Sequence, residues 1–180
     1  VTYAFELPDT DGATHRPGDA PATVVVFTCN HCPYALAWHD RLVRVALDYA
    51  PRGVRTLLVN PNDAERYPRD SVEAMRERVA RGELTGVPYL RDETQDVARA
   101  YDARVTPDVF VLDADLRLVY RGAPDADHGD EAQDAAWLRG ALDAVLEGAT
   151  PEPAQTEPRG CSVKWRPAPE AAAPPPSPAP

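Results

Sequence analysis

The pattern of apolar positions predicts a β-α-β unit near the start of the chain. Residues 23–28 form a continuous run, Thr-Val-Val-Val-Phe-Thr, which is typical of a strand covered on both faces. Residues 34–50 then repeat apolar side chains at helical spacing, and residues 54–60 return to an apolar run. The helical stripe consists of Trp38, Leu42, Val45, Ala46 and Tyr49. A helix of this length between two strands makes a crossover, so we expect the strands to be parallel.

Weaker patterns predict the remaining elements. An Asp11-Gly12 pair among alternating apolar and polar positions indicates a hairpin near residues 4–16, because that turn needs positive φ at both central residues. A helix is expected at 71–81, with Asp70 or Ser71 as its N-cap. The other expected elements are an extended segment at 87–90, a helix at 93–101, an antiparallel hairpin over 105–121 and a last helix at 131–147.

The composition changes after Thr150. Half of the 20 prolines lie beyond this residue, and the final run of Pro and Ala cannot bury a core. We therefore expect a domain over 1–150, an extension over 151–166 and a disordered Pro/Ala-rich tail over 167–180. The extension contains one patch of varied residues, Gly160-Cys161-Ser162-Val163-Lys164-Trp165, and a cysteine and a tryptophan in such a segment need an explanation.

The charge balance limits the possible partners. With 19 Lys and Arg against 29 Asp and Glu, the chain of 180 residues has a net charge of −10, which does not suit binding to nucleic acid or an anionic membrane. No apolar run approaches a membrane span, and no signal-like segment opens the sequence. Three cysteines are too few for a disulfide-stapled scaffold. We expect a monomeric, cytoplasmic protein without membrane or nucleic-acid partners.

The candidate chemistry lies between the first strand and its helix, in the segment Cys29-Asn30-His31-Cys32-Pro33. A helix N-terminus offers unpaired N–H groups and a partial positive charge, and both stabilise a thiolate. In such motifs the pKa of the first cysteine falls to roughly 3.5–7.5, so that it attacks disulfides at neutral pH. A redox-active Cys29–Cys32 pair is the favoured interpretation; half of a zinc site or two inert core cysteines are the alternatives.

The order of elements around this motif resembles the thioredoxin fold, an α/β fold with a central mixed sheet flanked by helices. The chain is similar in particular to the redoxin branch, which is grouped with alkyl hydroperoxide reductase and thiol-specific antioxidant proteins. Within that branch it resembles bacterial proteins with a Cys-Asn-His-Cys-Pro-Tyr motif and a terminal Gly-Cys-Ser-Val-Lys-Trp patch. Both motifs stand here, at residues 29–34 and 160–165.

The resemblance implies a role for each matching residue. Cys29 matches the nucleophile, and Cys32 matches the resolving thiol. Pro107 matches a cis-proline that faces the disulfide and exposes the backbone of Thr106 for pairing with an extended substrate. The implied activity is thiol–disulfide exchange with a protein or small-molecule disulfide and a thiol or disulfide electron partner. It needs no metal and no cofactor other than the Cys29–Cys32 disulfide itself.

The two residues between the cysteines are expected to tune the redox potential. Asn30-His31 places an imidazole next to Cys32, and a cation near the thiolate stabilises the reduced form. We therefore predict a potential above that of a thioredoxin with Gly-Pro at these positions. Many thioredoxins also carry a carboxylate on the strand before the motif, but residues 23–28 offer none. Proton transfer at Cys32 must then use water, His31 or another group.

Two other functions remain open. Peroxiredoxins place a threonine three residues before the reactive cysteine, and Thr28 has the wrong spacing for either Cys29 or Cys32, so a thiol peroxidase is the less favoured alternative. A copper or zinc protein could use Cys29, His31 and Cys32 together with His39. However, His39 lies about two helical turns beyond Cys32, which is too far to join one tetrahedron easily.

Cys161 allows two interpretations. The extension could fold back and bring this thiol to the Cys29–Cys32 pair as a third exchange partner, or as a lid docked through Trp165. Alternatively, Cys161 is a lone thiol on a segment held in place by the packing of Trp165. The sequence does not decide between them.

Overall fold

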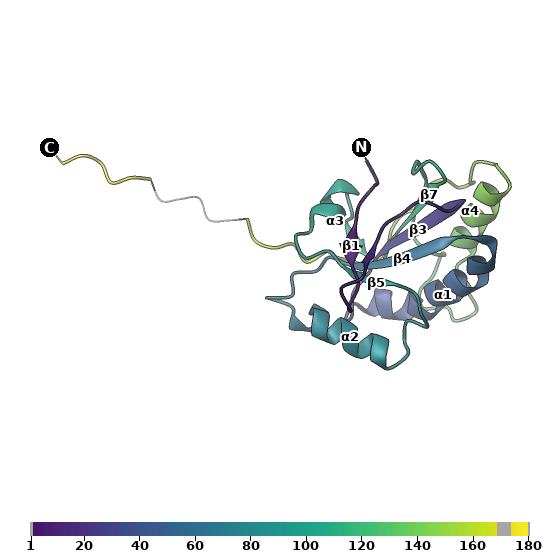
Figure 1. Ribbon diagram of the computed structural model, residues 1–180, viewed down its shortest axis with the longest axis horizontal. Coiled ribbons are helices and arrows are strands. Elements are labelled where there is room, and N and C mark those ends of the chain that lie inside the picture. The colour runs from purple at the N-terminus through teal and green to yellow at the C-terminus, as the bar shows by residue number, and fades with distance from the viewer. Residues whose placement is uncertain (1, 169–173, 180) are drawn as a thin grey trace.

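The computed structural model describes residues 2–168 and 174–179, and it has the expected α/β architecture with a central mixed sheet (Figure 1). The sheet has the strand order β5-β4-β3-β7-β8. Its strands are β3 (Ala22–Phe27), β4 (Arg55–Asn60), β5 (Tyr89–Arg91), β7 (Asp108–Asp113) and β8 (Leu118–Gly122). β3 pairs in parallel with β4 and antiparallel with β7, so the parallel β-α-β unit and the later hairpin share one central strand.

Helices cover both faces of this sheet. One core cluster joins β3 and β7 to α1 (Pro33–Tyr49), α2 (Val72–Ala80) and α4 (Ala136–Leu146). The second joins the opposite face to α3 (Asp96–Ala100) and to the N-terminal hairpin of β1 (Leu7–Pro8) and β2 (Thr14–His15). All six residues of β3 are buried, which agrees with its continuous apolar run. None of the helices in the described part of the chain is both long and apolar enough to cross a membrane.

Most element boundaries follow the sequence patterns, with one clear exception. α4 begins at Ala136 and not at 131, because the carboxylate of Asp125 holds the chain just before it. Asp125 accepts hydrogen bonds from the Ala135 N–H at 2.9 Å and from Trp38 Nε1 at 2.9 Å. Arg41, also on α1, forms an ion pair with the same buried carboxylate at 3.0 Å. Asp125 thus fixes α1 against the loop that leads into α4.

The extension folds back onto the domain. Thr156 lies beside the end of β8, where its N–H donates to Arg121 O at 3.0 Å and its hydroxyl accepts from the Ala123 N–H at 3.0 Å. Further along, β9 (Cys161–Ser162) pairs antiparallel with β6 (Val105–Thr106). Residues 167–168 and 174–179 belong to no helix or strand, and the predicted disorder of the tail also covers residues 169–173 and 180, which lie outside the described part.

Gly122 makes the contact with Thr156 possible. Its φ is +146°, and a Cβ there would lie 2.7 Å from Thr156 O and 2.9 Å from Thr156 N. We expect Gly122→Ala to lower the free energy of unfolding by about 2–4 kcal/mol, because overpacking and an unfavourable φ act together. Urea unfolding measures this change.

Gly140 provides the matched control. It is an exposed residue within α4, and a Cβ there would meet nothing within 4 Å. Gly140→Ala should therefore raise stability by about 0.5–1 kcal/mol, since alanine loses less backbone entropy in a helix. Equal effects of the two substitutions would contradict the packing of the extension described here.

Candidate functional site

Cys29 and Cys32 lie where β3 passes into α1. The Thr28 N–H still donates to Val59 O at 2.8 Å, so sheet pairing continues up to the residue before Cys29. α1 begins at Pro33, and Cys32 is its N-cap. Proline suits the first helical position because the N–H that it lacks would have no partner within the helix there. Each of the two cysteines is only 1% exposed.

Thr106 contacts both cysteines. Its Oγ1 lies 3.4 Å from Cys29 Sγ, and its carbonyl oxygen accepts a hydrogen bond from the Cys32 thiol at 3.2 Å. The Thr106–Pro107 peptide is cis, as the resemblance implied. Two segments 74 to 77 residues apart in sequence are thereby brought together at one pair of sulfurs.

The two thiols share a hydrogen bond that affects them in opposite directions. This bond and burial raise the pKa of Cys29, and the negative charge of Asp70 raises it further. The same bond lowers the pKa of Cys32, with help from the Cys161 thiol and the Ala35 N–H in the first turn of α1. Burial opposes this decrease but does not cancel it.

These directions concern the reduced protein, and the role of Cys29 as the nucleophile stays a prediction. α1 begins at Pro33, so the free N–H groups of its first turn lie next to Cys32. They add to the effect of the neighbouring thiols in lowering the pKa of Cys32.

The hydrogen-bonding edge of the Thr106 backbone differs from what the resemblance implied. The resemblance implied that the backbone of Thr106 is free to pair with an extended substrate. In the structure that edge is occupied by the protein's own extension, because Thr106 in β6 is paired with Cys161 in β9. Cys161 also packs against the cluster formed by Cys29, Cys32 and Ala35. The third cysteine of the chain thus lies at the same site.

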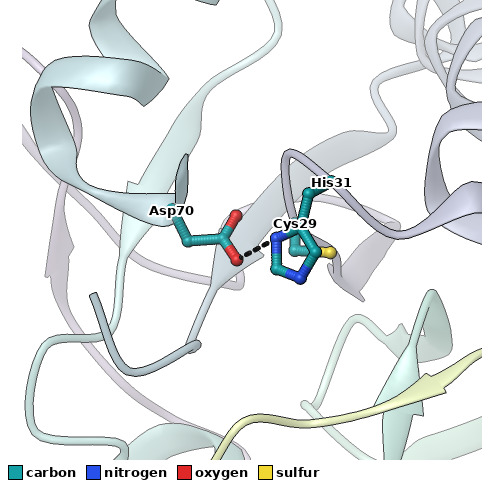
Figure 2. A group of neighbouring side chains, drawn as sticks. All are labelled: Cys29, His31 and Asp70. Atoms are coloured by element: carbon teal, nitrogen blue, oxygen red, sulfur yellow. Dashed lines mark ion pairs between the residues drawn. The ribbon is translucent and has the colours of Figure 1, made fainter. Parts of the chain in front are cut away.

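The carboxylate of Asp70 faces the imidazole of His31 beside Cys29 (Figure 2), and it also bonds to the backbone of the loop between the cysteines. Asp70 Oδ1 accepts hydrogen bonds from the Asn30 N–H at 2.7 Å and from Asn60 Nδ2 at 3.1 Å. Asp70 Oδ2 accepts from Asn62 Nδ2 at 3.0 Å and lies 2.7 Å from His31 Nδ1, an ion pair when the imidazole is protonated. Asp70 itself is fully buried, so these four partners replace its hydration.

The side chain of Asn30 is equally constrained. Its Nδ2 donates to Arg69 O at 2.9 Å, and its Oδ1 accepts from Arg78 Nη1 at 3.0 Å and from the Tyr89 hydroxyl at 2.7 Å. His31 stacks on Tyr67, with ring centroids 5.9 Å apart. Both residues between the cysteines are therefore held in place by several partners, all but Arg69 buried or half-buried, which fixes the geometry of the loop.

Three donors at the site have the chemistry of metal ligands. Cys29 Sγ, an imidazole nitrogen of His31 and a carboxylate oxygen of Asp70 lie within 4.8 Å of one another. His39, the fourth residue considered from the sequence, is engaged elsewhere, with its Nε2 2.7 Å from Glu83 O. Because both oxygens of Asp70 already have two partners each, the carboxylate is fully used without a metal.

Asp70 is the functional residue that the sequence analysis did not identify; it appeared there only as a candidate N-cap. Ser71 is the N-cap of α2, since its Oγ accepts from the Ala74 N–H at 3.1 Å. As the sequence indicated, the strand carries no carboxylate, but Asp70 supplies one from the short 3₁₀ helix Pro68–Asp70, forty residues beyond Asn30. Two asparagines at the carboxyl end of a parallel strand, Asn60 and Asn62, were the available signal in the sequence.

Comparisons with known proteins agree with this description. A sequence profile described as the AhpC/TSA family matches residues 2–121. The chain is similar to an uncharacterized conserved protein from Geobacillus kaustophilus, with 45% identity, a TM-score of 0.85, and coverage of 92% of this chain and 90% of that one. A hypothetical protein from Sinorhizobium meliloti 1021 gives 39% identity, a TM-score of 0.82 and coverage of 91% of each chain.

A more distant structure supports the fold alone. A secreted disulfide oxidoreductase from Mycobacterium tuberculosis has 19% identity and a TM-score of 0.61, over 79% of this chain and 96% of that one. The thioredoxin-like fold expected from the resemblance is therefore confirmed. The search of curated proteins gave no match.

The role of Asp70 can be tested by Asp70→Asn. The amide would place an NH₂ group against donors that now face a carboxylate, and would leave His31 without its ion-pair partner. We expect a loss of about 2–4 kcal/mol in the free energy of unfolding of the reduced protein. Asp115→Asn is the control, because Asp115 is exposed and its ion pair with Arg117 should contribute less than about 1 kcal/mol. Similar losses in both variants would refute the central position of Asp70.

Proposed function

The chain belongs to the AhpC/TSA family, and from that premise we propose that it is a thiol–disulfide oxidoreductase that works by reversible oxidation of Cys29 and Cys32. The observation that carries the proposal is the contact of both sulfurs with one residue, Thr106, beside a cis-proline. The two thiols also lie in one small buried cluster and shift each other's pKa, as is expected of neighbours that can form a disulfide.

The proposed reaction is an exchange of one disulfide for another. A thiolate of the site attacks a substrate disulfide, forms a mixed disulfide and expels one substrate thiolate. The second thiolate of the site then attacks the enzyme sulfur of that mixed disulfide and releases the other substrate thiolate. The substrate gains two electrons, and the Cys29–Cys32 disulfide remains. A thiol partner resets it by the same steps in reverse, so no cofactor is needed.

Asp70 and His31 are proposed to manage charge at the site. The buried carboxylate next to Cys29 disfavours a second negative charge there, and so adds to the effects of Cys32 and of burial in raising the pKa of Cys29. His31, held by Asp70 at 2.7 Å, compensates part of that charge when it is protonated. This pair also offers the proton-handling group that the strand before the motif lacks.

A thiol peroxidase is the second candidate, and one contact favours it. Peroxiredoxin chemistry needs a hydroxyl close to the reactive sulfur. Thr106 Oγ1 lies 3.4 Å from Cys29 Sγ and supplies such a hydroxyl. It comes from a distant segment, whereas the sequence analysis considered only a threonine three residues before the cysteine. Two observations oppose it: Cys29 is 1% exposed, and its pKa is raised by the hydrogen bond with Cys32 and by burial. A protonated, enclosed thiol is a poor peroxide nucleophile.

The exchange activity can be tested by reduction of insulin disulfides with dithiothreitol as the electron donor. We expect the protein to accelerate this reaction and the double variant Cys29→Ser/Cys32→Ser to return it to the uncatalysed rate, since the active-site disulfide can then not form. Asp115→Asn should leave the rate unchanged. A parallel assay with hydrogen peroxide should show only background consumption. Peroxide turnover that requires Cys29 alone would favour the peroxidase.

The tuning role of His31 can be tested separately. His31→Gln would remove the imidazole that pairs with Asp70 beside Cys29, and with it the positive charge that the protonated ring contributes to the reduced form. We expect the potential of the wild-type protein to lie above about −270 mV and the variant to lie lower by about 30 mV, as read from equilibration with glutathione buffers. His15→Gln, in the distant hairpin, should cause no shift. A wild-type potential at or below that reference would reject the tuning role.

A further inference from the structure

The extension runs through the active site as a short strap, defined here as residues 160–165. Its strand β9 adds antiparallel to β6, with Cys161 opposite Thr106. This is the backbone edge beside the cis-proline, next to both sulfurs of the pair. The strap therefore occupies the position at which an extended substrate chain would pair with the protein.

Gly160 shows that this close approach is built into the sequence. A Cβ at this position would lie 2.6 Å from the carbonyl carbon of Thr106 and 3.2 Å from Pro107 N, and it would be closer still to the Thr106 oxygen. Only glycine lets the two backbones come this near without displacement. The Gly-Cys order of the patch thus places the thiol of Cys161 directly after the point of closest contact.

The rest of the strap is firmly anchored. The Val163 N–H donates to Arg104 O at 3.0 Å, and the side chain of Val163 is buried. The Lys164 N–H donates to Asn62 Oδ1 at 2.9 Å, while Lys164 O accepts from Gln95 Nε2 at 2.9 Å. The guanidinium of Arg99 lies over the Trp165 ring, 4.8 Å from its centroid. These bonds to three separate segments keep Cys161 at the site.

The three cysteines differ in exposure. Cys29 and Cys32 are each 1% exposed, whereas Cys161 is half-buried and packs against the cluster that they form with Ala35. Exchange requires the attacking sulfur to reach the substrate sulfur. With the strap in place, Cys161 is the thiol that a disulfide in solution can reach.

We propose that Cys161 is a third catalytic thiol, which exchanges with the external disulfide and passes oxidation inward to the buried Cys29–Cys32 pair. This inference rests on the proposed function, since it names the residue of that same site that meets the substrate. In this proposal Cys161, and not Cys29 or Cys32, attacks the external disulfide first. The function of the strap is to hold Cys161 next to the buried pair.

The electrons balance over three steps. Cys161 gives its proton to the Cys32 thiolate and attacks the external disulfide, forming a Cys161–substrate mixed disulfide and expelling one substrate thiolate, which takes up a proton. Cys32, again deprotonated, attacks the Cys161 sulfur; a Cys32–Cys161 disulfide forms, and the second substrate thiolate leaves. Cys29 then attacks Cys32, and Cys161 leaves as the thiol. An external dithiol reverses the steps and resets the protein.

Oxidised glutathione serves as the probe, with each disulfide located by peptide mass mapping. In Cys32→Ser the relay is blocked after its first step, so glutathione should accumulate on Cys161. In Cys29→Ser it is blocked after the second, so a Cys32–Cys161 disulfide should accumulate. A glutathione adduct on Cys29 in the Cys32→Ser variant would overturn the proposal.

The rate of oxidation gives an independent test. Cys161→Ser should slow formation of the Cys29–Cys32 disulfide by about tenfold or more, since the buried pair must then wait for an opening that costs about 1.4 kcal/mol or more. Ser162→Ala, on the same strand, should have no effect. If the strap is a lid instead, Cys161→Ser will react as fast as the wild type or faster, and the relay is refuted.

Gly160→Ala separates the position of the strap from the presence of the thiol. It keeps all three cysteines but forces the strap away from Thr106, so the yield of the Cys32–Cys161 disulfide in a Cys29→Ser background should fall. An unchanged yield would contradict the proposed docking. Failure of the wild-type protein to form any Cys29–Cys32 disulfide would reject the proposed function itself, whereas equal rates for wild type and Cys161→Ser would reject only the relay.

Discussion

The geometry of the site depends on one buried carboxylate. Asp70 accepts hydrogen bonds from the backbone of Asn30 and from the side chains of Asn60 and Asn62, and it lies beside His31. A buried carboxylate is stable only when its oxygens accept hydrogen bonds. Movement of any one partner would therefore cost free energy, and this keeps all of the partners in place. The segment between the two cysteines is thereby tied to the loop that follows β4, and the sulfurs are held where Thr106 meets them.

Local features of the sequence were sufficient to predict the main elements. The continuous apolar run of β3, the apolar stripe of α1 and Pro33 in its first turn all act over short distances, and the structure places these elements as expected. The prediction that Cys29 and Cys32 form the reactive pair was based on the same local pattern. The cis-proline needed the resemblance, because no local signal distinguishes Pro107 from an ordinary proline at the start of a strand.

The features that could not be predicted are those that depend on tertiary contacts. Asp70 lies forty residues from Asn30, and nothing in its neighbourhood in the sequence distinguishes it from a helix cap. The pKa shifts of the two thiols depend on partners from distant segments, among them Asp70 for Cys29 and Cys161 for Cys32. Cys161 was recognised as unusual, but its pairing with Thr106 joins segments that only the folded chain brings together.

Asn62 connects two parts of the protein that the sequence separates by a hundred residues. Its Nδ2 donates to Asp70 Oδ2, and its Oδ1 accepts the N–H of Lys164 in the strap. Coupling of this kind is reciprocal: if the redox state of the sulfurs changes how tightly the strap is held, the strap changes the redox equilibrium by the same factor. A molecule that bound the chain beyond Trp165 and displaced the strap would then change the redox potential without contacting a sulfur atom.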